Sequence, residues 1–250
     1  MNHFSLAGRV AMITGCNKGL GQGLAVALAE AGADIVGVNR SAAAETRSRI
    51  EALGRRYIAV EAELGHAAPS EIVDQALSQA GRLDILVNNA GTIRRAPALE
   101  FSEADWDAVI DVNLKAAFFL SQAVARHLVA RKAPGRIVNV ASVLSFQGGV
   151  RVPSYTASKS GLLGLTRLLA NEWAPYGITV NAIAPGYMAT DNTQALSEDP
   201  IRSAEILGRI PTGRWGTPED LAGAIIFLCS DAAAYVNGHA LTVDGGWLAR

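Results

Sequence analysis

The sequence predicts an α/β fold in which a doubly wound sheet of about seven parallel strands carries helices on both faces. Short apolar runs, typical of buried strands, alternate with longer helical patterns along the whole chain. No linker or internal repeat interrupts this alternation, so residues 1–250 are expected to form a single domain. Half of the residues are apolar and 18% are charged, a composition that can build one large core.

The expected strands are short and mostly run into glycine, asparagine or proline, the residues that favour turns. In chain order they are residues 9–14, 33–38, 57–61, 83–87, 136–140, 178–184 and 239–243. Because a helical pattern separates most neighbouring strands, each strand is expected to run parallel to the one before it.

The expected helices have recognisable starts and ends. They are residues 24–31, 42–53, a helix after Pro69, 102–132, 153–176 and 218–229. Proline suits the first helical position, and glycine suits the position just after a helix, as at Gly32, Gly54 and Gly177. Residues 191–216 mix polar, apolar and turn residues after a strand, so they are expected to form a mobile lid inserted over a site.

A glycine-rich turn follows the first strand, with the spacing Gly15-x-x-x-Gly19-x-Gly21. Glycine lets a ligand approach the backbone, and the free N–H groups of a helix N-terminus attract an anion. A tight turn alone also favours glycine, but the position after the first strand favours a pyrophosphate site of the Rossmann type. The candidate ligand-binding residues in this turn are Gly15, Asn17, Lys18, Gly19, Leu20 and Gly21.

The second strand ends at Asn39-Arg40-Ser41, where dinucleotide folds select their cofactor. An acid here would bind the 2′-hydroxyl of the ribose, whereas an arginine accommodates a 2′-phosphate. Arg40 and the nearby Lys18 therefore favour NADP. The alternative is that both are ordinary solvated cations.

Further candidates follow the later strands. Ligands of an open parallel sheet bind at the carboxyl ends of its strands, so these residues are expected at one edge with the glycine turn. Asn89, Ala90 and Gly91 are expected against adenine and its ribose. The other candidates at this edge are Val140, Ser142, Pro185, Gly186, Met188 and Thr190.

Tyr155 and Lys159 lie four residues apart, which on a helix places them on one face with their β-carbons about 5–6 Å apart. An ammonium group beside a phenol lowers the pKa of the tyrosine from about 10, so Tyr155 is expected to act as a general acid/base, with Ser142 holding the same substrate oxygen. The alternative is a packed tyrosine and a solvated lysine. Asn113 lies among apolar residues, and is either a satisfied core amide or part of a proton relay.

Bulk composition excludes several functions. The net charge of −1 argues against nucleic-acid binding. No apolar run of 18 residues is present, no signal peptide is expected, and two cysteines form no disulfide framework, so the sequence favours a cytoplasmic protein that does not span a membrane. Four scattered histidines suggest no metal site. The apolar tail, residues 247–250, is expected to dock against either a neighbouring subunit or its own chain.

These motifs together resemble those of the short-chain dehydrogenases/reductases. They are Thr14-Gly15-x-x-x-Gly19-x-Gly21, Asn88-Asn89-Ala90-Gly91, Asn113, Ser142, Tyr155-x-x-x-Lys159 and Pro185-Gly186-x-x-x-Thr190. The resemblance implies a catalytic tetrad of Asn113, Ser142, Tyr155 and Lys159, an NAD or NADP cofactor, hydride transfer and a homotetramer. In this tetrad Lys159 would also bind the ribose, and Asn113 would hold a relay water. Glu63 stands where the family often has aspartate near the adenine.

Further segments resemble the 2-deoxy-D-gluconate 3-dehydrogenase group, which overlaps with the 2-dehydro-3-deoxy-D-gluconate 5-dehydrogenases. They are residues 89–95, 144–149, 151–155, 185–190 and 244–250. This resemblance implies a small sugar-acid substrate and commonly NAD. The expected substrate wall is Arg94, Ser142, Gln147, Tyr155, Tyr187 and Asn192.

Two other functions remain open from the sequence. One is a reductase of the same fold for another carbonyl substrate, such as a ketoacyl thioester or a polyol. The other is a dinucleotide-binding protein without catalysis, although such a protein has no need for Tyr155 and Lys159 together.

Overall fold

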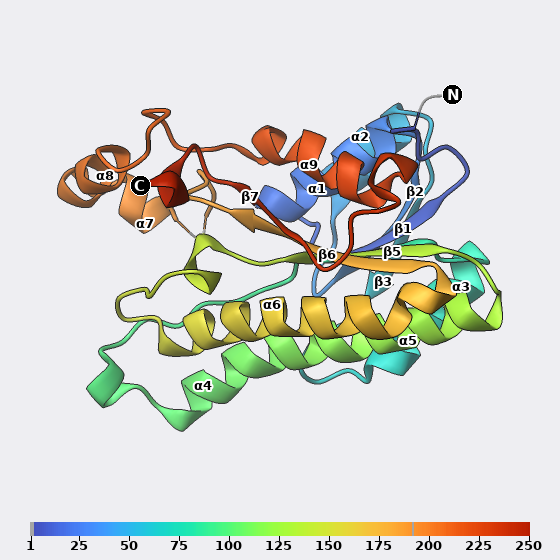
Figure 1. Cartoon of the computed structure of the whole chain (residues 1–250), viewed down its shortest axis with the longest axis horizontal. Helices are drawn as coiled ribbons and strands as arrows, with labels where there is room; N and C mark the ends of the chain where they lie inside the picture. The colour runs from blue at the N-terminus through green and yellow to red at the C-terminus, as the bar shows by residue number, and fades with distance from the viewer. Residues whose placement is uncertain (1–2, 192) are drawn as a thin grey trace.

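The computed structural model describes residues 3–191 and 193–250, and it confirms the predicted doubly wound sheet. Seven strands form one all-parallel sheet in the order β3-β2-β1-β4-β5-β6-β7 (Figure 1). Their bounds are β1 Val10–Thr14, β2 Asp34–Asn39, β3 Tyr57–Glu61, β4 Ile85–Asn88, β5 Gly135–Val140, β6 Ile178–Pro185 and β7 Ala240–Val243. The order reverses between β1 and β4, and a reversal of this kind leaves a crevice at the carboxyl ends of the strands.

Helices cover both faces of the sheet, as the sequence predicts. One face carries α1 (Gly19–Glu30), α2 (Ala44–Ala52) and α9 (Ala222–Cys229), and the other carries α3 (Pro69–Ala80), α4 (Glu103–Ile110), α5 (Ala116–Ala130) and α6 (Pro153–Trp173) (Figure 1). Successive strand residues point to opposite faces. In β1, Ala11 and Ile13 therefore enter one apolar core, whereas Val10 and Met12 enter the other.

The long helical segment differs from the uninterrupted helix that its pattern predicts. A π-helical turn, Asp111–Lys115, separates α4 from α5. A π turn inserts an extra residue and so changes which side chains face inward. Asn113 lies in this turn and is 1% exposed. By length and composition alone Glu103–Ala130 could cross a membrane, but here it packs against α3 and α6.

Other boundaries shift by a few residues. Helix α1 begins at Gly19, inside the glycine turn. The helix at 153–176 becomes a 3₁₀ turn at Ala174–Tyr176 before Gly177, whose φ of 74° ends it. The last predicted helix opens with a 3₁₀ turn, Pro218–Leu221, ahead of α9.

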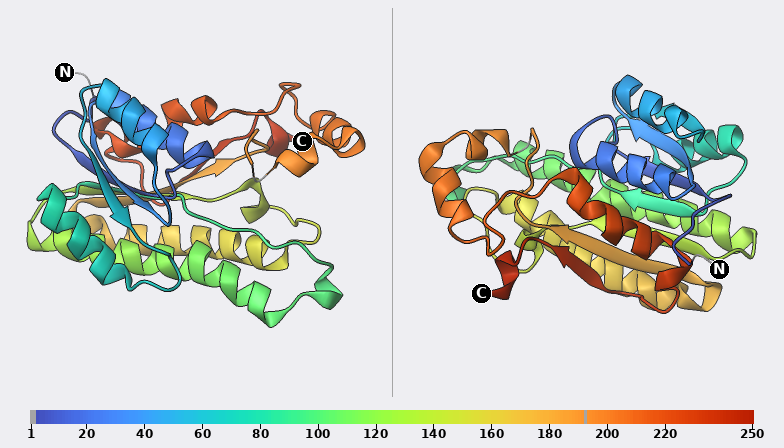
Figure 2. Two further views of the ribbon diagram at one scale, coloured as in Figure 1. Left: turned by 180° about the vertical axis from the view of Figure 1, so that it is seen from behind. Right: turned by 90° about the horizontal axis from the view of Figure 1, so that it is seen from above.

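Residues 191–216 contain two short helices, α7 (Gln194–Ser197) and α8 (Pro200–Leu207). Ile206 and Ile210 of this segment pack with Val143 and Trp247 in a small apolar cluster. Trp247 is 3% exposed, so this residue of the apolar tail packs within its own chain, whereas Ala249 and Arg250 are exposed. Helix α8 and the C-terminus lie at the opposite end of the molecule from the N-terminus (Figure 2).

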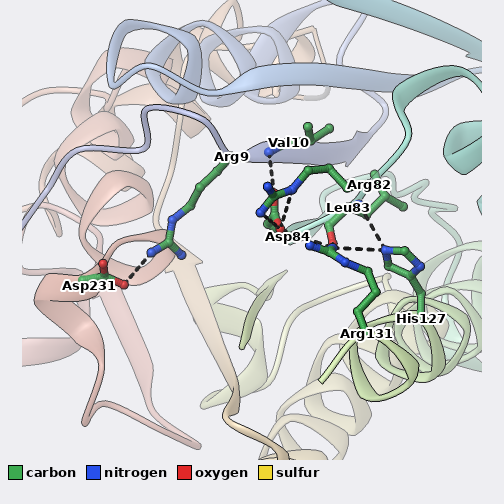
Figure 3. A network of polar contacts seen from close by, with 8 residues as sticks. All are labelled: Arg9, Val10, Arg82, Leu83, Asp84, His127, Arg131 and Asp231. Carbon is green, nitrogen blue, oxygen red and sulfur yellow. Dashed lines mark hydrogen bonds and ion pairs between the residues drawn. The ribbon is translucent and has the colours of Figure 1, made fainter. Parts of the chain in front are cut away.

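A polar network ties β4 to α5 at the amino ends of the strands (Figure 3). Asp84 is 4% exposed and accepts hydrogen bonds from Arg82, from Arg131 and from the backbone N–H of Val10. His127 Nε2 accepts a hydrogen bond from the Leu83 N–H at 3.3 Å. These residues lie at the edge of the sheet opposite the carboxyl-end crevice.

Candidate active site

A cleft of about 600 Å³ lies at the carboxyl ends of the strands, the edge that the sequence predicts. Every residue predicted to bind the cofactor lines this cleft. They are Gly15, Asn17, Lys18, Gly19, Leu20, Gly21, Arg40, Glu63, Asn89, Ala90, Gly91, Val140, Tyr155, Lys159, Pro185, Gly186, Met188 and Thr190. Segments far apart in the chain therefore meet at one site, because parallel strands bring their carboxyl ends to one edge.

Close backbone packing explains the glycines of the β1–α1 turn. A β-carbon at Gly21 would lie 2.0 Å from the carbonyl oxygen of Gly15, and Gly15 itself has a φ of 67°. Asn89 Nδ2 donates hydrogen bonds of 2.9 Å to the carbonyl oxygens of both Thr14 and Gly15. The Thr14 hydroxyl in turn accepts the N–H groups of Asn89 and Ala90. The end of β4 thus fixes the shape of the glycine turn, which leaves room for a diphosphate against the N-terminus of α1.

A buried polar cluster of Cys16, Asn39 and Tyr57 fixes the end of β2. Asn39 Oδ1 accepts the Cys16 N–H at 2.7 Å, and Asn39 Nδ2 donates to the Tyr57 hydroxyl at 3.1 Å. Both the oxygen and the nitrogen of the Asn39 amide are therefore already hydrogen-bonded within the protein. Arg40 and Lys18, the two cations predicted to favour NADP, are both paired with carboxylates, Arg40 with Glu63 at 3.4 Å and Lys18 with Asp191 at 2.5 Å.

Lys159 lies at the base of the cleft and is 4% exposed. Its Nζ donates a hydrogen bond of 2.6 Å to the carbonyl oxygen of Val140 and lies 5.7 Å from the centre of the Tyr155 ring. Burial lowers the pKa of Lys159 to about 8. An ammonium group has three donors, and one is used by this contact among the described residues, so the site suits the hydroxyls of a ribose.

The structure corrects the predicted direction of the Tyr155 pKa. Burial raises this pKa above its usual value, and this effect exceeds the lowering by the Ser142 hydrogen bond and by the charge of Arg95. Lys159 is not among the groups that lower it, because a lysine with a pKa of about 8 is itself neutral at the alkaline pH at which the phenol ionises. The reasoning from spacing placed the two groups correctly, but it left out the cost of burying both of them.

Ser142 lines the cleft with Tyr155 and Lys159, whereas Asn113, the fourth predicted catalytic residue, does not line it. Ser142 follows β5 and also accepts the Leu144 N–H at 3.1 Å, so its hydroxyl is fixed beside the phenol. The Asn113 amide accepts the Thr92 N–H at 2.8 Å and donates to the Thr92 carbonyl at 3.0 Å and to Ser158 at 3.2 Å. Asn113 is therefore a satisfied buried amide that connects the π turn to the end of β4 and to α6.

The predicted substrate wall is brought together only in part. Arg94 lines the cleft but is paired with Asp105 at 3.2 Å. Gln147 and Tyr187 do not line it, and Tyr187 packs on Trp247 with ring centroids 4.6 Å apart beside a separate cavity of about 190 Å³. Asn192 lies outside the described residues.

Sequence reasoning missed several residues of the cleft. Asp191, which lines the cleft, neutralises Lys18, and Arg95, which does not line it, acts on Tyr155 through its charge. Arg95 adjoins the motif that named Arg94, so the sequence offered a weak signal for it. Asp191 offered none, because its partner is 173 residues away.

Comparisons with known proteins agree with this geometry. A family model described as enoyl-(acyl carrier protein) reductase matches residues 15–248. The 2-dehydro-3-deoxy-D-gluconate 5-dehydrogenase of Escherichia coli (strain K12) is 60% identical over 252 residues, covering 100% of this chain and 99% of that protein. The enzyme of the same name from Dickeya dadantii (strain 3937) is 59% identical over 254 residues, covering 100% and 99%.

A solved structure is equally similar. It is a protein from Agrobacterium tumefaciens with bound NADP, assigned as a 2-deoxy-D-gluconate 3-dehydrogenase. It superposes with a TM-score of 0.95 at 57% identity, covering 100% of both chains. All of these similarities include the segments that form the cleft.

Proposed function

This chain belongs to the short-chain dehydrogenase/reductase family, and from that membership we propose that it oxidises or reduces a sugar acid with a nicotinamide dinucleotide as the hydride carrier. The relatives that are 60% and 59% identical act on 2-dehydro-3-deoxy-D-gluconate, which makes this compound the first substrate to test. The observation that carries the proposal is that Ser142, Tyr155 and Lys159 line the same cleft as the glycine turn.

The glycine turn and the strand ends fit a dinucleotide. The diphosphate would lie against the turn at Gly15–Gly21, the adenosine between Arg40 and Asn89–Gly91, and the nicotinamide end near Pro185–Thr190. The dinucleotide supplies a hydride to the substrate carbon or accepts one from it. We propose that NADP is accepted, because the end of β2 carries no acid for a 2′-hydroxyl, and NAD is the alternative that the related group favours.

The protein moves the proton. In the direction of reduction, the Tyr155 hydroxyl gives its proton to the carbonyl oxygen of the substrate as the hydride reaches the carbon, and in oxidation the phenolate takes that proton back. The Ser142 hydroxyl donates a hydrogen bond to the same oxygen, where negative charge develops. Lys159 holds the ribose hydroxyls, and below its own pKa of about 8 its positive charge stabilises negative charge that develops on the Tyr155 oxygen. Asn113 holds the strand end at Thr92 in position. We also propose that Asn113 holds a water molecule that relays the proton.

Other parts of the proposal concern the surroundings of the site. Residues 191–216 form a lid over the substrate, which excludes water when it closes. Arg94 binds the substrate carboxylate after the Arg94–Asp105 ion pair has broken, because an anionic substrate needs a cation. The enzyme acts in the cytoplasm as a homotetramer. A second candidate, reduction of an acyl thioester, is favoured only by the description of the family model.

Initial rates test the proposal directly. The purified protein is assayed with 2-dehydro-3-deoxy-D-gluconate, 2-deoxy-D-gluconate and D-gluconate, each with the matching oxidised or reduced forms of NAD and NADP. Rapid turnover of a sugar acid that is lost in Tyr155→Phe supports it. Dinucleotide binding without turnover of any of the three would overturn the substrate class, and an acetoacetyl thioester tests the second candidate.

A further inference from the structure

The charges in the cleft are nearly all paired. Four of the described residues that line it are lysine or arginine. They are Lys18, Arg40, Arg94 and Lys159. The first three each contact a carboxylate, whereas Lys159 contacts the backbone of Val140. An anionic ligand that uses one of the paired cations must therefore compete with an acid of the protein.

The pair at the adenosine end is Arg40 with Glu63, which joins the end of β2 to the loop after β3. Arg40 Nη1 lies 3.4 Å from Glu63 Oε1, and the two side chains are 79% and 52% exposed. An exposed pair at this distance is weak, because solvent screens it and both side chains lose freedom in forming it. A phosphate carries a larger charge than a carboxylate and can bind both edges of a guanidinium, so it can displace Glu63.

Of the described residues at the end of β2, 39–41, Arg40 alone carries a positive charge. The Asn39 amide is held by Cys16 and Tyr57, and it cannot turn to a ribose without breaking both contacts. The Ser41 hydroxyl accepts a hydrogen bond of 3.2 Å from Asn17 and can still donate its O–H to a ligand, but it carries no charge. Arg40 is therefore the group at this strand end that distinguishes a 2′-phosphate from a 2′-hydroxyl.

We propose that Glu63 is a specificity-determining residue, and that its carboxylate competes with the 2′-phosphate of NADP for Arg40. The inference rests on the proposed dinucleotide site. Glu63 weakens the binding of NADP selectively, because NAD has no phosphate that needs Arg40. The Arg40–Glu63 pair thereby makes the affinities for NADP and NAD more similar than they would be if Arg40 had no carboxylate partner. Removing the carboxylate shifts the preference towards NADP.

Ligand fragments test this without any catalysis. The dissociation constants of adenosine 2′,5′-bisphosphate and of 5′-AMP are measured by calorimetry for the wild type, Glu63→Gln, Arg40→Gln and the double variant. In Glu63→Gln we expect the bisphosphate to bind about three- to tenfold more tightly relative to AMP, because both fragments contain adenine and any contact of Glu63 with that ring cancels in the ratio. The gain shrinks at high salt. NADPH and NADH are then compared in the same way.

The double variant separates competition from simple repulsion between Glu63 and the phosphate. If Glu63 acts through Arg40, the Glu63→Gln change has no further effect once Arg40 is glutamine. The same gain in the Arg40→Gln background overturns the proposal, and so does an equal change for both ligands. Glu205→Gln is the matched control, since it removes a carboxylate from the exposed ion pair with Arg202, which does not line the cleft, and it is expected to leave the ratio of the two ligands unchanged.

The outcome is independent of the substrate. Neither fragment contains nicotinamide or a sugar acid, so failure to turn over sugar acids leaves this test valid. A Glu63→Gln variant without any shift would remove Glu63 from cofactor choice and leave the proposed reaction untouched.

Discussion

Lys159 donates a hydrogen bond of 2.6 Å to the carbonyl oxygen of Val140, and this contact fixes a buried ammonium group between the end of β5 and helix α6. The carbonyl lies two residues before Ser142, and the lysine lies one helical turn after Tyr155. One backbone contact therefore sets the distance between the strand end and the helix that carry the proposed chemistry.

Replacing Lys159 by methionine should separate catalysis from stability. Turnover should fall by at least about 100-fold, because the phenolate and the ribose lose their cation. Folding stability at pH 7 should be maintained or rise, because methionine does not carry a charge into a site where burial lowers the lysine pKa to about 8. Denaturant unfolding with circular dichroism measures this difference.

The difference in folding stability between the wild type and Lys159→Met should depend on pH. A lysine pKa that is lower in the folded state makes the wild type gain stability as pH rises from about 8 towards the unfolded value of 10.5. The stability advantage of Lys159→Met should therefore narrow by up to about 3 kcal/mol across this range. A difference that stays constant with pH would mean that the ammonium is fully solvated in the fold.

The pH profile of oxidation should depend on Ser142 and Arg95. Burial raises the pKa of Tyr155, so the phenolate needed for oxidation forms at alkaline pH, and oxidation should speed up as pH rises from 7 to 10. The Ser142 hydrogen bond and the Arg95 charge lower this pKa, so Ser142→Ala and Arg95→Gln should each move the profile to higher pH. Profiles of kcat/KM measure the shift.

Arg94→Gln is the matched control for Arg95→Gln. The two residues are neighbours, but Arg94 is paired with Asp105 and is not among the groups that act on Tyr155. Its profile should keep the wild-type midpoint while KM for the sugar acid rises. An acid shift in Arg95→Gln would contradict the prediction.

Two glycine-to-alanine changes should differ in their effect: one should weaken dinucleotide binding, and the other should stabilise the fold. A β-carbon at Gly21 would lie 2.0 Å from the Gly15 carbonyl oxygen, so Gly21→Ala must displace the turn and should weaken dinucleotide binding at least about 100-fold. Gly164 in α6 has no atom within 4 Å of the same position, and Gly164→Ala should stabilise the helix by about 1 kcal/mol without affecting binding. Thermal melts and dinucleotide titration check both variants.

His127 should make the fold sensitive to mild acid. Burial and the charge of Arg131 lower the pKa of His127. Its Nε2 accepts the Leu83 N–H, a contact that protonation of Nε2 would break (Figure 3). The unfolded chain therefore binds more protons below about pH 6.5, and the folded state loses stability as pH falls through this range.

His127→Gln tests this because an amide oxygen can accept the same N–H without titrating. Its Tm should fall less than that of the wild type between pH 7 and pH 5. His127→Leu, which removes the acceptor, should lower Tm at both pH values. Equal slopes for the wild type and His127→Gln would assign the acid sensitivity to other groups.

The sequence and the structure agree best where chemistry is local. The glycines of the β1–α1 turn, Ser142 and Lys159 were predicted from turn chemistry, strand ends and helical spacing, and all of them line the cleft. The substrate wall was predicted with less success. The Tyr187 ring packs against Trp215 and Trp247, which come from distant segments, and it does not line the cleft.

The sequence by itself determined the order of strands and helices, the glycine turn and the Tyr155–Lys159 pair, because each depends on residues a few positions apart. Only the tertiary structure decided the partners of Arg40 and Lys18, the π turn at Asn113 and the direction of the Tyr155 pKa. These depend on burial and on charges from segments such as Glu63 and Asp191, which chain folding brings close and local spacing does not encode.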